Sequence, residues 1–163
     1  MMKKYYLGID PGSPLTFALI SPTGKWIARA TGDLVGGKIG KYFRNSPEAC
    51  AYVVKKWQAN THYPLHAVIE SIGPRQGEGV VTASEFVASM KISQMMCVCY
   101  GIPYTLVSPQ KWKKALSLDS DKEKSRMLAR QLWPDKAEVL KFKKSHNLAE
   151  AALLGYYGLK ETL

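Results

Sequence analysis

The sequence predicts a mixed α/β fold in which a five-stranded sheet, with three antiparallel strands followed by parallel strands, is flanked by helices. Three short apolar runs joined by turns open the chain, and two later apolar runs each stand between helical segments. Consecutive strands joined by a tight turn pair antiparallel, whereas strands separated by a helix can pair in parallel. The 163 residues, 46% of them hydrophobic, suffice for one core, and we expect a single domain over residues 1–163.

The five predicted strands are apolar runs bounded by turn residues. Pro22, Thr23 and Gly24 give a tight turn between the second and third runs, which predicts an antiparallel meander. The fourth run fits a buried parallel strand. The predicted strands are Tyr5–Asp10, Leu15–Ser21, Lys25–Ala30, His66–Glu70 and Tyr104–Val107.

Five helices are predicted between and after these strands. The first begins near Pro47, a residue suited to the first helical turn, and residues 71–80 form a loop because they hold three Gly and one Pro. The second helix carries an apolar stripe typical of a core or dimer face, at Phe86, Val87, Met90, Met95, Val98 and Cys99. The predicted helices span 47–59, Thr82–Tyr100, Pro109–Leu118, Asp121–Leu132 and Asn147–Leu159.

The charge balance favours an acidic polymer as partner. Lys and Arg number 23 against 13 Asp and Glu, a formal net charge of +10, and residues 111–144 alone hold 11 basic against 5 acidic residues. We expect this segment to face DNA. Contacts between lysine or arginine and the DNA phosphates give affinity but do not recognise sequence. A membrane surface is a second possible partner, but no bilayer span is expected, because Gly101–Pro103 interrupts the longest uncharged stretch.

The three cysteines, Cys50, Cys97 and Cys99, lie in apolar surroundings and form no paired framework. We therefore expect buried thiols and a reducing, cytoplasmic compartment. A metal clip at Cys97 and Cys99 lacks a visible second ligand pair, so we set it aside.

Three carboxylates stand where a site is expected. Asp10 and Glu70 each close a predicted core strand, and Glu150 lies on the last helix with His146 four residues earlier on the same face. Carboxylates brought together repel one another unless a hard divalent cation lies between them, so convergence implies Mg²⁺ or Mn²⁺. Such a site in a basic protein points to phosphodiester cleavage.

Each of these residues also has a simpler interpretation. Asp10 before Pro-Gly can form an Asx turn, Glu70 can cap the following loop, Glu150 can lie at a solvated helix edge, and His146 can be a neighbour of the helix N-cap. The joint pattern favours the site, because three simple explanations rarely coincide in a chain whose excess charge is positive.

Four blocks of sequence resemble the RuvC-type Holliday junction resolvases of the ribonuclease H-like superfamily, in particular the phage and prophage branch. The blocks are "GIDPG" at 8–12, "VIES" with the loop "GPRQGEGV" at 68–80, "GIPYTLVSPQKWKKAL" at 101–116 and "KKSHNLAEAALLGYYG" at 143–158. The resemblance implies a homodimeric nuclease that uses two Mg²⁺ or Mn²⁺ ions per active site. It also implies symmetric nicking of opposing strands in a four-way DNA junction.

The resemblance also implies roles for single residues. Asp10 is expected to be the ligand shared by both metals, with Glu70 and Glu150 as further ligands. His146 is the preferred fourth ligand or proton carrier, although Ser145 and Asn147 remain alternatives for that position.

Basic residues are expected to contact the substrate. Lys113 and Lys124 resemble the family's cations near the scissile phosphate, and Arg75 and Gln76 of the loop after Glu70 are expected to reach the junction centre. The full set of expected DNA contacts is Arg75, Gln76, Lys111, Lys113, Lys114, Lys122, Lys124, Arg126, Lys143 and Lys144.

Two other classes of protein share parts of this pattern. An actin-like or sugar-kinase ATPase also opens on a strand-end aspartate and a glycine turn, but it needs a second lobe for which 163 residues leave no room. A broader branched or flap DNA nuclease, or a junction-binding protein that does not cleave, is the stronger alternative, because Ser145 stands where many related phage proteins have Asp.

Overall fold

The computed structural model describes residues 3–12, 14–31, 47–71, 73 and 79–162. These residues build one five-stranded sheet in the order β3-β2-β1-β4-β5. β1 pairs antiparallel with β2, and β2 with β3, whereas β4 pairs parallel with both β1 and β5. The predicted mixed sheet is therefore confirmed. The strands are β1 (Tyr5–Asp10), β2 (Thr16–Ile20), β3 (Trp26–Thr31), β4 (Leu65–Glu70) and β5 (Tyr104–Val107).

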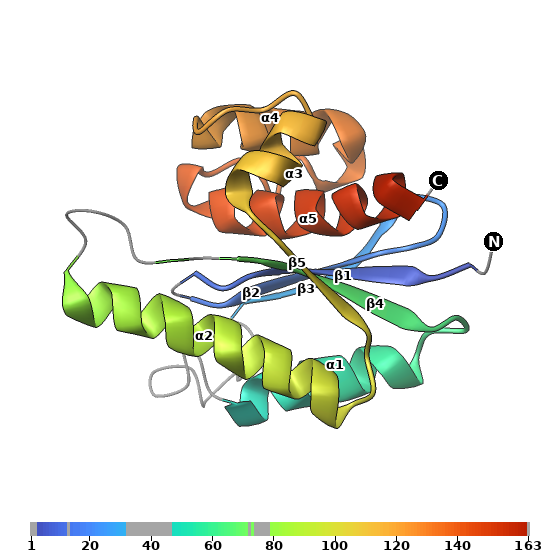
Figure 1. The fold of residues 1–163 in the computed structure, drawn as a ribbon. Helices are drawn as coiled ribbons and strands as arrows, with labels where there is room; N and C mark the ends of the chain where they lie inside the picture. The colour runs from blue at the N-terminus through green and yellow to red at the C-terminus, as the bar shows by residue number, and fades with distance from the viewer. Residues whose placement is uncertain (1–2, 13, 32–46, 72, 74–78, 163) are drawn as a thin grey trace.

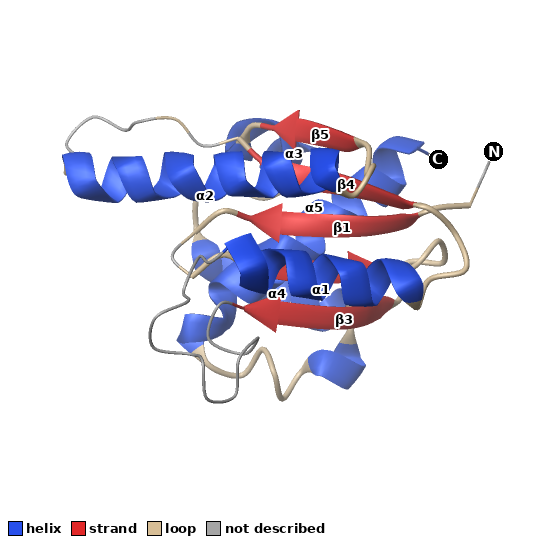
Figure 2. Ribbon diagram, turned by 90° about the horizontal axis from the view of Figure 1, so that it is seen from below, coloured by secondary structure: helices blue, strands red, loops and turns tan. Residues whose placement is uncertain are grey.

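Helices cover both faces of the sheet (Figures 1 and 2). Helix α5 lies along one face with α3 and α4 stacked beyond it, and α1 and α2 lie on the opposite face. We call these the α5 face and the α1–α2 face. The helices are α1 (Pro47–Ala59), α2 (Val80–Cys99), α3 (Pro109–Ala115), α4 (Lys122–Leu132) and α5 (His146–Thr162).

Strand alternation separates two apolar cores. Tyr6 and Val68 belong to the core of the α5 face, whereas the residue that follows each of them belongs to the core of the α1–α2 face. Successive strand residues point to opposite faces of a sheet. Asp10, four residues after Tyr6, and Glu70, two residues after Val68, therefore both point toward α5.

Two glycines, Gly8 of β1 and Gly155 of α5, let α5 lie directly on β1. A Cβ added to Gly8 would stand 1.8 Å from the backbone oxygen of Ala151 and 2.5 Å from the backbone nitrogen of Gly155, distances that no side chain can occupy. Gly8 precedes Asp10 by two residues on the same face, and Ala151 follows Glu150. This close packing therefore brings the end of β1 and the first turns of α5 together.

Every predicted strand and helix is present, with ends that differ from prediction by three residues or fewer. Two short 3₁₀ helices, η1 (Pro134–Lys136) and η2 (Lys143–Ser145), were not predicted. Each is a single turn held by local bonds, such as the 2.9 Å bond from the Ser145 N–H to the Phe142 carbonyl, and carries no apolar period that could announce it.

The apolar stripe predicted on α2 as a core or dimer face lies only partly in the core. Met90 is buried, but Met95 and Val98 are 63% and 64% exposed. The buried face runs instead through Ser89 and Ser93, whose hydroxyls donate to carbonyls one turn earlier on the same helix at 2.9 and 2.8 Å. Serine is compatible with burial here because its own helix satisfies the hydroxyl.

The cysteine prediction needs one correction. Cys50 and Cys97 are buried as expected, and burial raises the pKa of the Cys97 thiol to about 12, which leaves it protonated at neutral pH. Cys99 is exposed, because it lies near the end of α2 on the side that points away from the sheet.

Across the described residues, no helix has both the length and the apolar composition needed to cross a bilayer.

Candidate active site

Asp10 ends β1 and is 5% exposed. Its Oδ1 accepts a 3.1 Å hydrogen bond from the Gly12 backbone N–H, which is the Asx turn expected from the Pro-Gly that follows. The simple interpretation of Asp10 therefore holds, and it coexists with a position at the carboxyl end of a central strand. The turn fixes the carboxylate at the edge of the sheet, facing α5.

Glu70 ends the neighbouring strand β4 and is 7% exposed. The parallel register pairs Ile9 with Ile69, so the next residues along the two strands, Asp10 and Glu70, lie side by side. Oε1 of Glu70 accepts a 2.9 Å hydrogen bond from the indole N–H of Trp112, a fully buried residue of α3. A carboxylate buried at a strand end is thus bonded to a side chain that lies 42 residues further along the chain.

Glu150 lies in the second turn of α5 and is also 7% exposed, so the interpretation of a solvated helix edge is wrong. Its Oε1 accepts from Nζ of Lys113 at 2.7 Å, and both side chains are largely removed from solvent. The close packing of α5 on β1 at the next residue, Ala151, is consistent with this burial.

The three carboxylates interact electrostatically. The pKa of Asp10 is raised well above its ordinary value, first by burial and then by the negative charges of Glu70 and Glu150. The Gly12 N–H and the ammonium of Lys122 oppose this rise without cancelling it. The charges of Glu70 and Glu150 therefore reach Asp10 at the carboxyl ends of the strands, and a shared site for the three acids stays a prediction.

The donor set fits a hard divalent cation. Three buried carboxylates offer oxygen ligands, and a cation among them would relieve the repulsion that raises the pKa of Asp10. Among the described residues, no three His, Cys, Asp or Glu side chains are already gathered closely enough to hold one ion. Glu70 and Glu150 are instead bonded to Trp112 and Lys113 of α3. Mg²⁺ or Mn²⁺ at this site stays a prediction.

His146 is the first residue of α5 and is half-buried. Its Nδ1 lies 2.9 Å from the Lys143 carbonyl, and since a carbonyl only accepts, Nδ1 carries the proton. The spacing of four residues keeps His146 on the helix face of Glu150. Nε2 is then the nitrogen able to bind an ion or move a proton, which stays a prediction.

The two alternatives to His146 differ in their surroundings. Ser145 donates its hydroxyl to the Val139 carbonyl at 2.8 Å, so it holds the segment before α5 in place. The Asn147 amide nitrogen lies beside Gly12, 3.6 Å from the position that a Cβ there would occupy, and so close to the Asx turn of Asp10. Of the two, only Asn147 has an observed position next to a predicted ligand.

The predicted DNA contacts fall into three groups. Arg75 and Gln76 lie outside the described residues. Arg126 is buried, and its guanidinium donates to the Leu140 and Lys141 carbonyls and pairs with Glu123, so it anchors α4 to the segment before α5. The remaining lysines besides Lys113 are exposed: Lys111, Lys114, Lys122, Lys124, Lys143 and Lys144.

Lys113 and Lys124, the two predicted cations near the scissile phosphate, have different partners. Lys113 is bonded to Glu150 within the carboxylate cluster. Lys124 pairs with Asp119, and both side chains are more than half exposed. Lys122, predicted only as a DNA contact, lies near enough to Asp10 to lower its pKa.

Trp112 is the site residue that the sequence did not reveal. In the sequence Trp112 is one more apolar residue in a basic helix. Only the folded structure shows that its indole N–H bonds Glu70. The one available signal is chemical, because a buried tryptophan needs an acceptor for its N–H and the acid at the end of a neighbouring strand can supply it.

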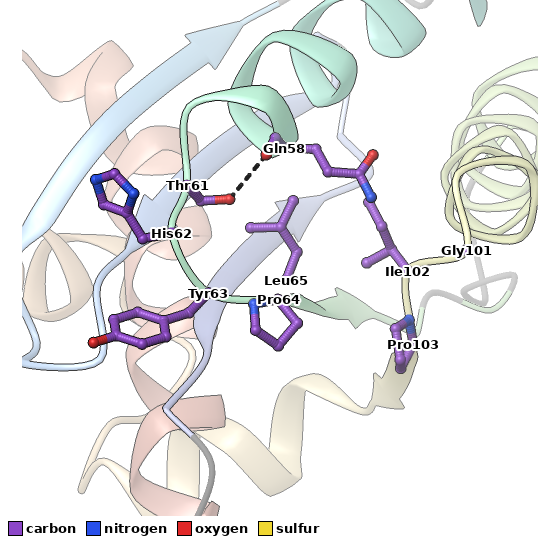
Figure 3. Close-up of a pocket in the computed structure, with 9 residues that line it drawn as sticks. All are labelled: Gln58, Thr61, His62, Tyr63, Pro64, Leu65, Gly101, Ile102 and Pro103. Atoms are coloured by element: carbon purple, nitrogen blue, oxygen red, sulfur yellow. Dashed lines mark hydrogen bonds between the residues drawn. The ribbon is translucent and has the colours of Figure 1, made fainter.

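A pocket of about 330 Å³ lies at the other end of the sheet (Figure 3). Leu65 at the start of β4 lines it, whereas Glu70 ends the same strand about 17 Å away. The pocket is therefore separate from the carboxylates. Its lining residues are Gln58, Thr61, His62, Tyr63, Pro64, Leu65, Gly101, Ile102 and Pro103.

The sheet order and the helical layers on its two faces give the predicted ribonuclease H-like fold. No protein-family model and no curated protein matches the sequence. Solved structures do match. Thermus thermophilus RuvC in complex with a Holliday junction substrate matches with a TM-score of 0.64 and 14% identity, over 98% of this chain and 95% of its own.

Two further structures have the same fold. A second Thermus thermophilus RuvC structure matches with a TM-score of 0.59 and 16% identity, over 97% of this chain and 96% of its own. The yeast mitochondrial Holliday junction resolvase Ydc2 matches with a TM-score of 0.50 and 14% identity, over 95% of this chain and 77% of its own.

Proposed function

We propose that this protein is a divalent-metal-dependent endonuclease that resolves four-way (Holliday) DNA junctions by paired, symmetric nicks. One observation carries the proposal: buried Asp10 and Glu70 lie side by side at the carboxyl ends of β1 and β4, and the negative charges of Glu70 and Glu150 both raise the pKa of Asp10. The fold shared with RuvC supports it, because acids at the strand ends of this fold stand where a phosphodiester can meet metal ions.

The proposed chemistry divides between ions and side chains. Two Mg²⁺ or Mn²⁺ ions bound by the carboxylates would activate water and stabilise the leaving oxygen. Asp10 is the proposed shared ligand, since the charges of both other acids raise its pKa. His146 completes the ligand set or carries a proton through Nε2, and Lys113 supplies positive charge beside Glu150.

The proposed DNA surface consists of the exposed lysines Lys111, Lys114, Lys122, Lys124, Lys143 and Lys144. They come from α3, α4 and η2, and α3 and α4 lie on the α5 face of the sheet (Figure 1). We leave Arg126 out because its guanidinium is already bonded within the fold. Contacts of this kind bind phosphates and predict affinity for junctions that falls steeply as salt is raised.

We further propose a homodimer, because a junction presents two strands for cutting and a twofold protein matches a twofold substrate. Exposed apolar side chains on α2 and on the edge strand β5 offer the surface, which we call the α2–β5 patch: Val80, Val81, Met95, Val98, Tyr104 and Leu106. Light scattering at micromolar concentration should give about twice the 18.1 kDa chain mass, and Val98→Lys should restore the monomer.

The decisive experiment compares three labelled DNAs, a mobile four-way junction, a flap and a plain duplex, in Mg²⁺, Mn²⁺ or EDTA. The proposal predicts paired nicks at symmetric positions in the junction, none in the duplex and no cleavage in EDTA. Equal cutting of flap and junction would favour the broader branched-DNA nuclease. Tight junction binding with no nick in either metal would favour a binding protein and overturn the proposal.

A further inference from the structure

Helix α3 holds two of the three site carboxylates through two consecutive residues. Trp112 bonds Glu70 of β4 at 2.9 Å, and Lys113 bonds Glu150 of α5 at 2.7 Å. The two acids belong to different elements, so this one turn of helix ties the end of β4 to the start of α5.

The turn is itself firmly placed. The side chain of Ser108 caps α3 by accepting from the Lys111 N–H, and Pro109 occupies the first helical turn. Trp112 is fully buried in the core of the α5 face, and the Lys113 ammonium lies 5.3 Å from the centre of its ring. Both donors therefore start from a fixed backbone, and the buried Trp112 ring has little freedom to move, whereas the flexible stem of Lys113 lets its ammonium leave Glu150.

The two donors differ in kind. The indole N–H is neutral, so it orients the Glu70 carboxylate without cancelling its charge. The Lys113 ammonium is a cation on Glu150, so it stands where a metal ion would bring its own positive charge. Trp112 therefore leaves the charge of Glu70 available to a metal ion, whereas Lys113 neutralises the charge of Glu150.

We propose that α3 is a positioning element for the metal site, an inference that rests on the proposed function. Trp112 is a positioning residue that holds Glu70 in the orientation used to bind metal. Lys113 is a competing cation that screens Glu150 until metal binds and is then released toward the substrate. Loss of the Trp112 N–H should therefore weaken metal binding, whereas loss of the Lys113 charge should strengthen it.

The test measures Mn²⁺ binding to the intact protein without DNA, by following free Mn²⁺ in electron paramagnetic resonance titrations. Trp112→Phe keeps the buried ring and removes only the N–H, and it should raise the Kd for Mn²⁺ about 10-fold or more, as expected when an outer partner of a metal ligand is lost. Lys113→Met keeps the aliphatic stem and should lower the Kd about fivefold.

Matched controls separate positioning from general structural effects. Trp133→Phe also removes one indole N–H from a buried tryptophan, but its lost bond is to the Gly24 carbonyl, away from the site. Lys91→Met removes an exposed lysine charge from α2, on the opposite face of the sheet. Both controls should bind Mn²⁺ as the parent does, even where Trp133→Phe lowers the melting temperature as much as Trp112→Phe.

The outcomes are distinct. If the parent binds Mn²⁺ and Trp112→Phe binds it as Trp133→Phe does, the positioning role is wrong while the proposed function stands. If Lys113→Met weakens Mn²⁺ binding, Lys113 is not a competing cation and that half of the proposal falls. If the parent binds no Mn²⁺ at millimolar concentration, the metal site itself fails and both proposals fall with it.

Discussion

The last residues of β1 and β4, Asp10 and Glu70, point to the α5 face, whereas the residues before them, Ile9 and Ile69, point to the α1–α2 face. The first pair is buried beside a third acid and carries unfavourable electrostatic energy, and the second pair is ordinary apolar core. The difference shows how one sheet can hold a destabilising cluster. Strand alternation confines the repulsion to one face while the other face contributes apolar burial.

The helices on the two faces also differ in how they pack and in which residues they expose. Helix α5 lies on β1 through Gly8 and Gly155, close enough to bring Glu150 to the strand ends. Helix α2 on the opposite face turns apolar residues such as Met95 and Val98 outward. We therefore assign chemistry to the α5 face and association with a second copy to the α2–β5 patch.

The largest expected effect comes from removing an acid of the α5 face. Asp10→Asn should lower junction cleavage by about 10³-fold or more, because it removes the proposed ligand shared by both metals. Junction binding should persist or tighten, since a negative charge facing the phosphate is lost. Cleavage and gel-shift assays on one labelled junction measure both quantities.

Asp119→Asn is the matched control for this variant. It also neutralises one aspartate in the same molecule, but Asp119 is exposed and paired with Lys124 rather than with the site acids. Its cleavage rate should stay within a few-fold of the parent. Near-normal cleavage by Asp10→Asn would show that the site is misassigned.

The next effect concerns the contact that builds the α5 face. Gly8→Ala should lower the free energy of unfolding by about 3 kcal/mol or more, because its Cβ would meet the backbone of α5 and neither element can move without repacking the core. Gly73→Ala, where an added Cβ meets nothing within 4 Å, should change it by less than about 0.5 kcal/mol. Urea denaturation measures both, and equal stabilities would contradict the close packing of α5 on β1.

Sequence reasoning reached the strands and helices, and the strand-end positions of Asp10 and Glu70, because these are local properties. Strand ends follow from apolar runs and turn residues, and Asp10 and Glu70 are simply the last residues of such runs. The position of Glu150 near Asp10 and Glu70 was inferred from chemistry, because three such acids in a chain of positive net charge favour one shared metal site.

The parts that the sequence could not predict depend on tertiary contacts. Trp112 and Lys113 meet their acids across 42 and 37 residues, and no local pattern encodes such a pairing. The burial of Gly8 against Ala151 has the same character, because a glycine before an aspartate reads equally well as part of the turn. The exposure of Cys99 depends on how α2 is rotated on the sheet, which its broadly apolar sequence does not fix.

A smaller effect is expected at His146. His146→Ala should lower cleavage by about 10²-fold, since Nε2 is the nitrogen available for a metal or a proton on the helix face of Glu150. Ser145→Ala removes the bond to the Val139 carbonyl and should cost about 1 kcal/mol of stability with little change in cleavage. Single-turnover rates at saturating Mn²⁺ and melting curves separate the two, and parent-like cleavage by His146→Ala would remove the histidine from the site.

The smallest effect is a stability change of the metal-free protein on the α5 face. Folding raises the pKa of Asp10, so the folded state holds its proton more tightly than the unfolded state does. Stability from this group is therefore fully present below the unfolded value near 3.8 and is lost as the pH rises through the folded pKa. Above the unfolded value Asp10 therefore opposes folding, and Asp10→Asn should melt at a higher temperature than the parent in EDTA at neutral pH.

Each kcal/mol of repulsion relieved should raise the melting temperature by about 2–4 °C for a chain of this size. The advantage of Asp10→Asn should shrink as the pH is lowered toward the unfolded value near 3.8, because the unfolded parent then keeps the Asp10 proton as the folded parent does. Mg²⁺ should stabilise the parent more than the variant, since only the parent keeps all three acids for the ion to neutralise. Thermal melts from pH 4 to 8 with EDTA or Mg²⁺ test this, with Asp119→Asn as the control. A parent that is more stable than Asp10→Asn in EDTA at pH 7 would mean that the three carboxylates do not repel one another in the folded protein.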